Sequence, residues 1–170
     1  MPSCRNSGFT LMELMVTLAV LAILLAVGLP SFQGSLRSNR LATTTNELIA
    51  SMSLARSEAI RNGRGSGVCA SADGASCGDD WAAGWLVWQD ANGNGNLDAG
   101  EAVLRFSQGN AKIAASATAD VIAFDSRGRR RAANDQSIGL QPTDCPGGDL
   151  RRTVTVNTTG QIKTTKGACS

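Results

Sequence analysis

A stretch of 21 residues near the start of the chain, Phe9–Leu29, is almost entirely apolar yet contains one carboxylate, Glu13. At a rise of 1.5 Å per residue, a helix of this length would span the roughly 30 Å hydrocarbon core of a bilayer. A charge at membrane depth costs about 3 kcal/mol on insertion scales, so it usually persists where another group pairs with it. The segment therefore predicts an anchoring helix in which Glu13 requires a partner.

The residues before this segment, MPSCRNSG, are few and polar, and Arg5 would hold them on the cytoplasmic side of a membrane. An ordinary secretory signal peptide also has a basic start and an apolar core, with a small-residue cleavage site here near Gly28. Such a core has no reason to contain Glu13, and 21 residues suffice to cross a bilayer. The pattern favours a retained anchor over a removed signal peptide.

The sequence GFTLMELMVTLAVLAILLAVGLPSF resembles the class III signal of type IV pilins and type II secretion pseudopilins. The resemblance implies that a prepilin peptidase of the inner membrane cuts after Gly8 and that the new amino-terminal residue, Phe9, is N-methylated. Glu13 then becomes the fifth residue of the mature chain, where the family has a glutamate that pairs with the α-ammonium of a neighbouring subunit. Pro30 matches a further family position and would kink or locally unwind the helix.

After Pro30 the chain keeps a helical rhythm, because apolar and small residues recur at spacings of three and four. These positions are Leu41, Thr45, Leu48, Met52, Ala55 and Ala59. Gly63 is a typical stop, so Phe9–Asn62 is predicted to form one helix. The run LARSEAIRNG at its end resembles the minor pilins and pseudopilins of the GspH/FimT class, and this resemblance covers essentially the whole chain.

Beyond Gly63 the pattern changes to short strands separated by turn residues, and TVTVNTTGQIKT reads as a hairpin turning at Thr158–Gly160. The predicted strands are Gly65–Ala70, Gly84–Gln89, Ala102–Ser107, Lys112–Ala115, Val121–Asp125, Ser137–Leu140, Thr153–Asn157 and Gln161–Thr164. The fold class is α+β: a long amino-terminal helix packed on an antiparallel β-sheet head, which is the pilin fold. The expected organisation is a leader at 1–8, a transmembrane and assembly helix at 9–29, a helix continuation packing on the head at 30–63, and a β-rich head at 64–170.

Three tryptophans, Trp81, Trp85 and Trp88, are the other conspicuous side chains of the head. With unbroken alternation, Trp85 and Trp88 lie on opposite faces of one strand. At least one of them is therefore expected in the core, packed against the helix.

Cys4 belongs to the implied leader, and the head that remains lies outside the cytoplasm, where disulfides are the expected state. The remaining cysteines are Cys69, Cys77, Cys145 and Cys169. Four cysteines allow three pairings, of which Cys69–Cys77 with Cys145–Cys169 is favoured because each closes a Gly-rich local loop. A metal site at these cysteines is disfavoured, since their spacing is not CxxC and the chain has no histidine.

The segment DANGNGNLDAGE, Asp90–Glu101, matches the calcium-binding loop pattern of an EF-hand. Its ligand positions are Asp90, Asn92, Asn94, the backbone carbonyl of Asn96, Asp98 and Glu101. The flanking sequences read as strands, so the helices of an EF-hand are missing, and three carboxylates predict weak affinity. The alternative is a β-hairpin tip rich in residues that tolerate turn dihedrals. No cofactor is required by any other feature, so Ca²⁺ is the one cofactor considered.

Charge is unevenly distributed, with three basic and eight acidic residues in 64–125 but eight basic and three acidic residues in 126–170. The candidates for DNA contact in the basic part are Arg129, Arg131, Lys163 and Lys166. Some members of the FimT branch resemble DNA-uptake receptors with a Gly-Arg-x-Arg pattern in the carboxy-terminal hairpin, where this chain has Gly160–Lys163 with one charge lost. Gly128–Arg131 satisfies the pattern at an earlier strand end. No aromatics interleave these residues, and the alternative is a solvated edge that blunts strand pairing.

Together these features predict that the protein is a structural subunit. The predicted role is that of a minor pilin that primes or caps a type IV pilus and so serves adhesion, motility or DNA uptake. The alternatives are a type II secretion pseudopilin and a DNA-binding pilus-tip receptor for natural transformation. An enzyme is disfavoured, because histidine is absent and no nucleophile–base pair stands out. The implied partners are other pilins in a helical filament, the prepilin peptidase and the inner membrane before assembly. The head would lie in the periplasm and later in an extracellular pilus or periplasmic pseudopilus.

Overall fold

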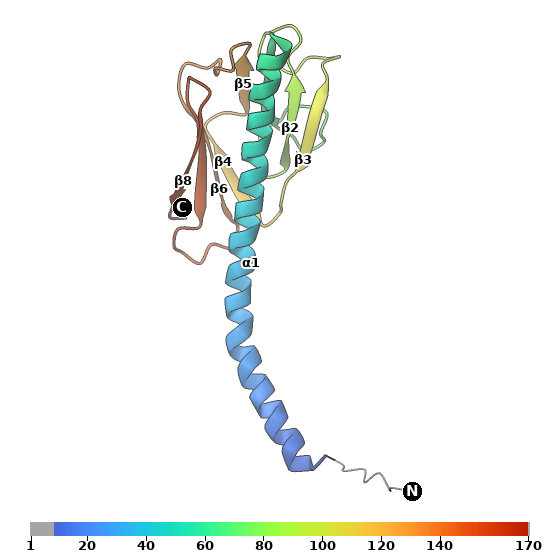
Figure 1. The fold of residues 1–170 in the computed structure, drawn as a ribbon, viewed down its shortest axis with the longest axis vertical. Helices are drawn as coiled ribbons and strands as arrows, with labels where there is room; N and C mark the ends of the chain where they lie inside the picture. Colours follow the sequence, from blue (N-terminus) through green and yellow to red (C-terminus); the bar gives the residue numbers. More distant parts are fainter. Residues whose placement is uncertain (1–8, 170) are drawn as a thin grey trace, which may run out of the picture. The chain divides into compact units, whose positions relative to one another are not determined.

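The computed structural model describes residues 9–169, with the backbone alone at 27 and 29–31 (Figure 1). The chain divides into two compact units, Met1–Arg37 and Ser38–Ser170. The first contains the start of the only α-helix among the described residues, and the second contains the rest of that helix together with all the strands.

Helix α1, Leu11–Asn62, begins two residues later than predicted and ends at the predicted residue. Thr10 precedes its first turn, and its hydroxyl Oγ1 accepts a hydrogen bond from the N–H of Glu13 at 3.3 Å, which satisfies a donor that the helix itself cannot. Gly63 ends the helix with a φ of 69°, a conformation that suits a residue without Cβ. The backbone is helical through Pro30, so the local unwinding expected there is not seen.

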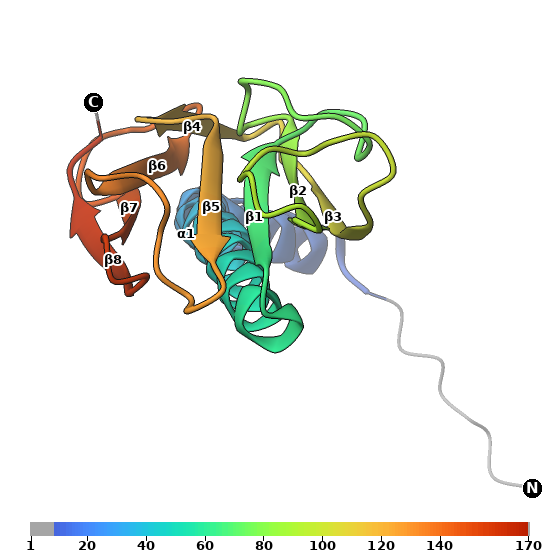
Figure 2. The same cartoon turned by 90° about the horizontal axis from the view of Figure 1, so that it is seen from above.

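Eight strands form the head, in two antiparallel four-stranded sheets (Figures 1 and 2). The first sheet has the order β3-β2-β1-β5 and the second β4-β6-β7-β8. Their bounds are β1 Gly65–Ala70, β2 Gly84–Gln89, β3 Val103–Gln108, β4 Ile113–Ala117, β5 Val121–Asp125, β6 Gln136–Pro142, β7 Arg151–Val156 and β8 Ile162–Gly167. All eight predicted strands are confirmed, three of them to the residue, and the others differ by a few residues at their ends.

The predicted carboxy-terminal hairpin is also confirmed, since β7 pairs with β8 around the turn at Thr158–Gly160. The Asn157 side chain organises this turn, because its Oδ1 accepts hydrogen bonds from the N–H groups of Thr159 and Gln161 at 3.0 and 2.9 Å. Asparagine caps turns in this way because its short side chain reaches the backbone two residues ahead.

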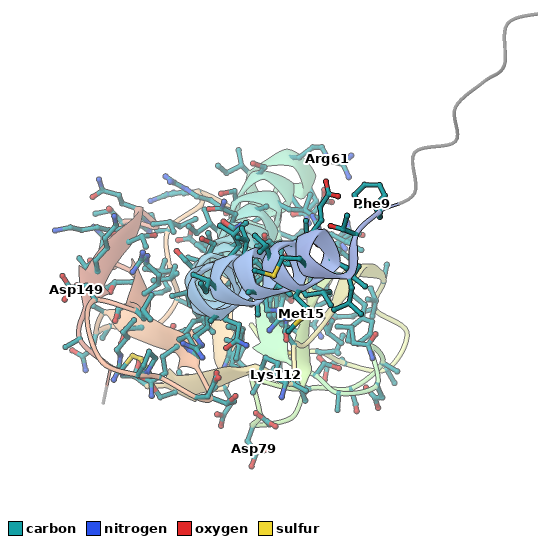
Figure 3. The ribbon with its side chains drawn as sticks, turned by 90° about the horizontal axis from the view of Figure 1, so that it is seen from below. Phe9, Met15, Arg61, Asp79, Lys112 and Asp149 are labelled. Atoms are coloured by element: carbon teal, nitrogen blue, oxygen red, sulfur yellow. A yellow bond between two sulfur atoms is a disulfide. The ribbon has the colours of Figure 1, made fainter. Side chains whose placement is uncertain are left out.

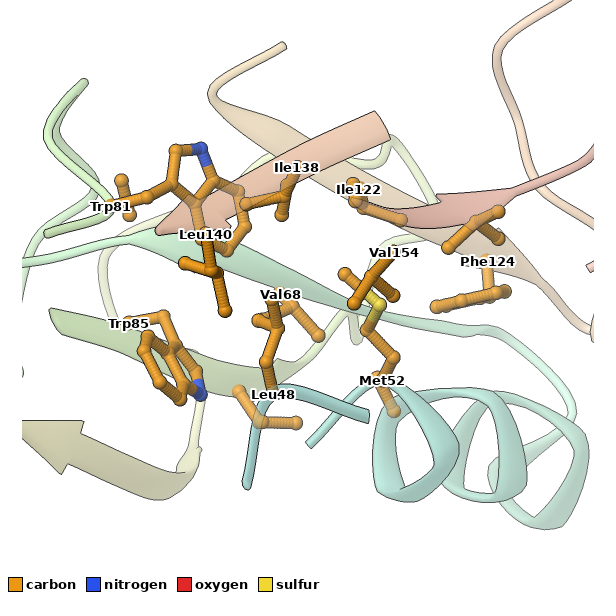
Figure 4. Close-up of a cluster of buried hydrophobic side chains, with 14 of the residues drawn as sticks. Leu48, Met52, Val68, Trp81, Trp85, Ile122, Phe124, Ile138, Leu140 and Val154 are labelled. Atoms are coloured by element: carbon orange, nitrogen blue, oxygen red, sulfur yellow. The ribbon is translucent and has the colours of Figure 1, made fainter. Parts of the chain in front are cut away.

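The head half of α1 buries one face against both sheets, and that face consists of the residues whose spacing predicted it. Leu41, Thr45, Leu48, Met52, Ala55 and Ala59 are all buried. Figure 4 shows Leu48 and Met52 packed among side chains from the sheets, including Val68, Phe124 and Val154. Fully burying a leucine-sized side chain stabilises the fold by about 1.5–3 kcal/mol, so this face is the main attachment of the helix to the head.

The tryptophans occupy both faces of the first sheet. Trp85 lies in the main core, and its Nε1–H donates to Ser51 Oγ of α1 at 3.0 Å. Trp88, three residues later, lies in a smaller cluster on the other face with Cys69 and Leu86. The prediction that at least one of them lies in the core and packs against the helix is therefore confirmed by Trp85. A Cβ at Gly67, the β1 residue paired with Trp88, would overlap the indole ring, so glycine is needed there.

Candidate functional sites

The amino-terminal part of α1 exposes apolar side chains around the helix. Phe9 is 81% exposed, and the other exposed large apolar residues of this part are Leu11, Met12, Leu14, Met15, Val16, Leu18, Val20, Leu21, Ile23, Leu24 and Leu25. Figure 3 shows Phe9 and Met15 at this end of the helix. Within residues 9–169, no helix combines the length and mean hydropathy required of a membrane span. So large an exposed apolar surface is a typical mark of an interaction site.

Glu13 lies within this surface and is exposed. Among the described residues its carboxylate has no hydrogen-bond or ion-pair partner, although its own N–H is capped by Thr10. The expected cleavage site lies between Gly8 and Phe9, and Gly8 is outside the described residues. The carboxylate is thus available to a group from another molecule, as the resemblance implied.

Both expected disulfides are present in the head. Cys69 of β1 is bonded to Cys77 across a Cα–Cα distance of 5.6 Å, and Cys145 is bonded to Cys169 across 6.4 Å. The first anchors the loop after β1 to the sheet, and the second joins the β6–β7 connection to the segment after β8. Loops of this size stabilise a fold by about 3 kcal/mol each, through restriction of the unfolded chain.

The acidic loop Asp90–Glu101 connects β2 to β3 and is held by its own hydrogen bonds. Asp90 is fully buried, and its carboxylate accepts from the N–H groups of Gly93 and Gly95 at 2.7 and 2.8 Å. The Nη2 of Arg131 lies 3.5 Å from the same carboxylate. A guanidinium at this position reduces the negative charge that a cation would meet.

The remaining ligand positions of the loop also bond to one another. The amides of Asn92 and Asn94 both donate to Asp98 Oδ2 at 2.7 Å, and these bonds, the Asn92 bond first, lower the pKa of Asp98. Glu101 accepts from the N–H groups of Ala91 and Asp98. Among residues 9–169, no three or more His, Cys, Asp or Glu side chains are arranged to hold a metal ion. Calcium binding remains a prediction, in which the amides would turn their oxygens inward.

Calcium is expected to raise the melting temperature of the full-length protein in detergent, because a ligand bound only by the folded state stabilises it. At 100 times the dissociation constant the gain is about 2.7 kcal/mol. Glu101→Ala should abolish the calcium-dependent shift, and Asp80→Asn, a change outside the loop, should retain it. Because Glu101 also caps the loop, the shift on adding calcium is compared within each variant. If the melting curves of the wild type are equal with and without millimolar Ca²⁺, the calcium hypothesis is rejected and the loop is only the tip of a β-hairpin.

The four basic candidates for DNA contact do not share one face. Arg129 pairs with Asp125, with Nη2 and Oδ2 3.2 Å apart, and Arg131 pairs with Asp90. Lys163 and Lys166 both lie on β8, an edge strand, three residues apart. Successive side chains of a strand point to opposite faces, so these two lysines do too. Strand alternation therefore separates Lys163 from Lys166, and DNA contact by the four residues remains a prediction.

Asp125 organises the turn that follows β5. Burial raises the pKa of its carboxyl, but the N–H groups of Arg129 and Arg127 and the Arg129 guanidinium outweigh this, so the pKa lies below its ordinary value. The Asp125 carboxylate is therefore ionised at neutral pH and holds Arg129. This arrangement leaves Arg129 less available to a phosphate than its sequence position suggested.

Arg130 lies between two of the predicted DNA-contact residues, Arg129 and Arg131, but was not itself predicted as a site residue. It forms an isolated antiparallel bridge with Phe124 and is 5% exposed. Bridge partners place their side chains on the same side, and Phe124 faces the core. Because side chains alternate along an extended chain, Arg130 is expected to point to the side opposite Arg129 and Arg131. Only the pairing with Phe124 shows that this side faces the core.

DNA binding through the basic segment remains a prediction with a direct test. If Arg129 and Arg131 contact phosphates, the Arg129→Gln, Arg131→Gln double variant should weaken retention on duplex DNA for every sequence. It should also lower the slope of log affinity against log salt by about two units. Arg105→Gln with Lys112→Gln removes the same charge elsewhere and should change neither. Equal retention of wild type and double variant at low salt, with both folded by circular dichroism, would eliminate this patch.

Comparison with known proteins decides the family. Residues 44–160 match the family of the type II transport protein GspH. The chain belongs to the GspH family. Residues 3–29 of the chain also match the prokaryotic N-terminal methylation motif, and this range includes the Gly8–Phe9 junction and Glu13.

One curated relative of this chain is the pilin-like protein PilA1 of Thermus thermophilus, 36% identical over 107 residues. The match covers 61% of this chain, which in turn spans 62% of the length of the relative. The chain thus spans less than two thirds of the length of this relative.

Two solved structures share the fold of this chain. The type IV minor pilin FimU of Pseudomonas aeruginosa PAO1 superposes with a TM-score of 0.60 at 23% identity, over 78% of this chain and 94% of that one. The minor pseudopilin EpsH of the Vibrio cholerae type 2 secretion system gives 0.52 at 13% identity, over 74% and 95%. These likenesses confirm the predicted α+β pilin fold.

Proposed function

We propose that this GspH-family protein is a minor pilin of a type IV pilus, which acts in priming or tip assembly of the filament. The proposal rests chiefly on Glu13, an unpartnered carboxylate within the exposed apolar part of α1. A free carboxylate there suits a subunit whose helices pack against those of its neighbours. The pilin-like name of the 36% identical relative supports the same assignment. Adhesion, motility or DNA uptake by such a pilus would then depend on this subunit.

The amino-terminal segment accounts for each step of this role. Before assembly, the apolar helix would be held in the inner membrane with the head in the periplasm. A prepilin peptidase would cut between Gly8 and Phe9 and expose a new α-ammonium. That ammonium and the Glu13 carboxylate of a neighbouring subunit would neutralise each other, which offsets the cost of burying both. Disulfides at Cys69–Cys77 and Cys145–Cys169 suit the oxidising compartment in which the head would lie.

A type II secretion pseudopilin is the second candidate, and the GspH description of the family favours it. Deletion of the gene separates the two roles. A minor pilin predicts loss of surface pili with secretion intact, and complementation with the wild-type chain should restore the pili. Loss of secreted enzymes from the medium, with piliation unchanged, would establish the pseudopilin instead.

Processing is tested by mass spectrometry of the intact protein from membranes. The mature chain is expected to begin at N-methylated Phe9. A Gly8→Ala variant should retain the leader and fail to assemble, because the peptidase recognises the glycine before the scissile bond. A mature chain that begins near Pro30 would instead establish a secreted protein without an anchor.

A further inference from the structure

The Arg130 guanidinium is buried without a partner. Its Nε, Nη1 and Nη2 are all inaccessible to solvent, and none has a hydrogen-bond partner among the described residues. Burying a charge without satisfying its donors costs several kcal/mol, so natural chains rarely keep such a group. Burial lowers the pKa of Arg130 and nearby Asp135 raises it, but an arginine remains cationic at neutral pH. The described residues therefore supply Arg130 with a nearby anion, Asp135, but with no hydrogen-bonded one.

Arg130 lines a pocket of about 450 Å³ at the end of the first sheet. The wall is formed by residues 129–133, with Asp125 on one side and Thr158 of the carboxy-terminal hairpin on the other. Arg130 is joined to that hairpin through its backbone, since its N–H donates to the carbonyl of Thr158 at 3.3 Å. The pocket thus lies where the β5 turn meets the β7–β8 turn.

The other arginines of the pocket already have partners. Arg129 is held by Asp125, and Arg131 by Asp90 and by the carbonyl of Arg64 at 3.4 Å. Arg130 is therefore the one arginine among the residues lining this pocket whose guanidinium has no hydrogen-bond partner. A guanidinium presents its donors as a planar fork, which fits the two oxygens of one carboxylate.

The rim of the pocket can give access to Arg130. Residues 132–135 are exposed, and none of them makes a hydrogen bond within the described part of the chain. Two of the lining residues, Ala132 and Ala133, have small side chains that fill little of the pocket. A displacement of this segment would therefore break no hydrogen bond.

We propose that the Arg130 pocket receives a carboxylate of a neighbouring subunit, from an Asp or Glu side chain or a chain terminus, when the head packs into the filament. The proposal builds on the pilin-like function proposed above. A single buried cation fits one carboxylate, whereas DNA needs a row of exposed unpaired cations. Here the flanking arginines are engaged, and no aromatic residue lines the pocket for base stacking.

The binding test uses full-length protein in detergent micelles with ¹⁵N-labelled arginine. N-acetylglutamate should shift the Arg130 Nε–Hε resonance in a saturable way, and sodium chloride at the same ionic strength should not. In the Arg130→Gln variant the binding is followed through the Nε–Hε resonances of Arg129 and Arg131, which line the same pocket. Binding should weaken about tenfold to a hundredfold, as expected for the loss of one hydrogen bond to a charged group. Arg127→Gln should leave the binding unchanged. A response to a twelve-nucleotide single strand but not to N-acetylglutamate would overturn the carboxylate assignment in favour of DNA.

Stability distinguishes a receiving site from a structural arginine. Arg130→Met should raise the melting temperature of the free protein, because an apolar side chain replaces an unsatisfied buried charge. Asp135→Asn should leave the melting temperature within about 2 °C of wild type, since that change removes no hydrogen bond of Arg130. A clear fall in melting temperature for both variants would show that Asp135 is the partner of Arg130 and would overturn the proposal.

Assembly provides the final test. A photo-crosslinking residue in place of Ala133 should join the head to an acidic segment or a chain terminus of a neighbouring subunit in sheared filaments. Arg130→Gln should remove that crosslink while processing continues. Normal assembly of Arg130→Gln, with the crosslink unchanged, would overturn the pocket proposal and leave the proposed function standing. If the wild-type chain is absent from every filament, the proposed function is refuted. Carboxylate binding by the pocket would then be tested only by the shift of the Arg130 Nε–Hε resonance on addition of N-acetylglutamate.

Discussion

Glu13→Ala is expected to abolish incorporation of the protein into filaments while leaving its membrane insertion intact or improved. Removing one member of a buried ion pair leaves the other charge uncompensated, at a cost of about 3–5 kcal/mol. That cost corresponds to more than a hundredfold loss in association at each contact. The measurement is the fraction of the chain in sheared filaments relative to membranes, determined by immunoblot in a strain that lacks the wild-type gene.

Conservative variants separate charge from shape at this position. Glu13→Asp keeps the carboxylate and should retain partial incorporation, whereas Glu13→Gln keeps the size but not the charge and should fail like alanine. Thr10→Ala removes only the hydroxyl that caps the Glu13 N–H and should cost about 1 kcal/mol of helix stability. Filament entry of Glu13→Ala equal to wild type would refute the pairing argument.

The second large effect is expected from Gly160→Ala, which should destabilise the head by about 3 kcal/mol. Gly160 has a φ of 79°, and an added Cβ would overlap the carbonyl oxygen of Gly128 in the β5 turn. Backbone cannot move aside as a flexible side chain can, so the two turns would have to separate. The melting temperature by circular dichroism should fall by about 10 °C.

Gly148→Ala is the matched control for this variant. Gly148 has a φ of 84°, close to that of Gly160, but no atom lies within 4 Å of its added Cβ. It therefore carries the dihedral penalty alone, about 1 kcal/mol, and its melting temperature should fall by about 3 °C. Equal effects of the two substitutions would show that the contact between Gly160 and Gly128 does not stabilise the head.

The contact at Gly160 also positions the Arg130 pocket. An added Cβ at Gly128 would press on Ile60 of α1, so the β5 turn lies between the helix and the carboxy-terminal hairpin. Thr158 of that hairpin lines the pocket and accepts the N–H of Arg130. Gly160→Ala should therefore impair carboxylate binding as well as stability, whereas Gly148→Ala should not.

Much of the fold could be predicted because its signals are local. The face of α1 from Leu41 to Ala59 repeats at helical spacing, and β1, β2 and β5 were located to the residue by short apolar runs between turn residues. Both disulfides close loops that are short in sequence, with separations of 8 and 24 residues. The helix face and the strands depend on residues that are only a few positions apart in the sequence. The disulfides close short loops, whose ends meet at a low cost in chain entropy.

The order and faces of the strands depend on contacts between distant segments, which periodicity does not specify. Lys163 and Lys166 appeared as one basic group with Arg129 and Arg131, yet strand alternation and ion pairs with Asp125 and Asp90 separate them. The Asp90–Glu101 loop matched a cation-binding pattern, while its partner Arg131 lies 41 residues beyond Asp90.

The sequence by itself therefore determined the amino-terminal helix, the position of Glu13, the strands and the disulfide pairs, because these follow from short-range periodicity, composition and loop length. Only the tertiary structure decided that Arg130 is buried, since that requires its bridge to Phe124 and the packing of the Thr158 hairpin beside it. Burial is a property of the surroundings that the whole fold assembles around a side chain. Alternation along the chain therefore indicated only that Arg130 points away from the side of Arg129 and Arg131, and not that this side is buried.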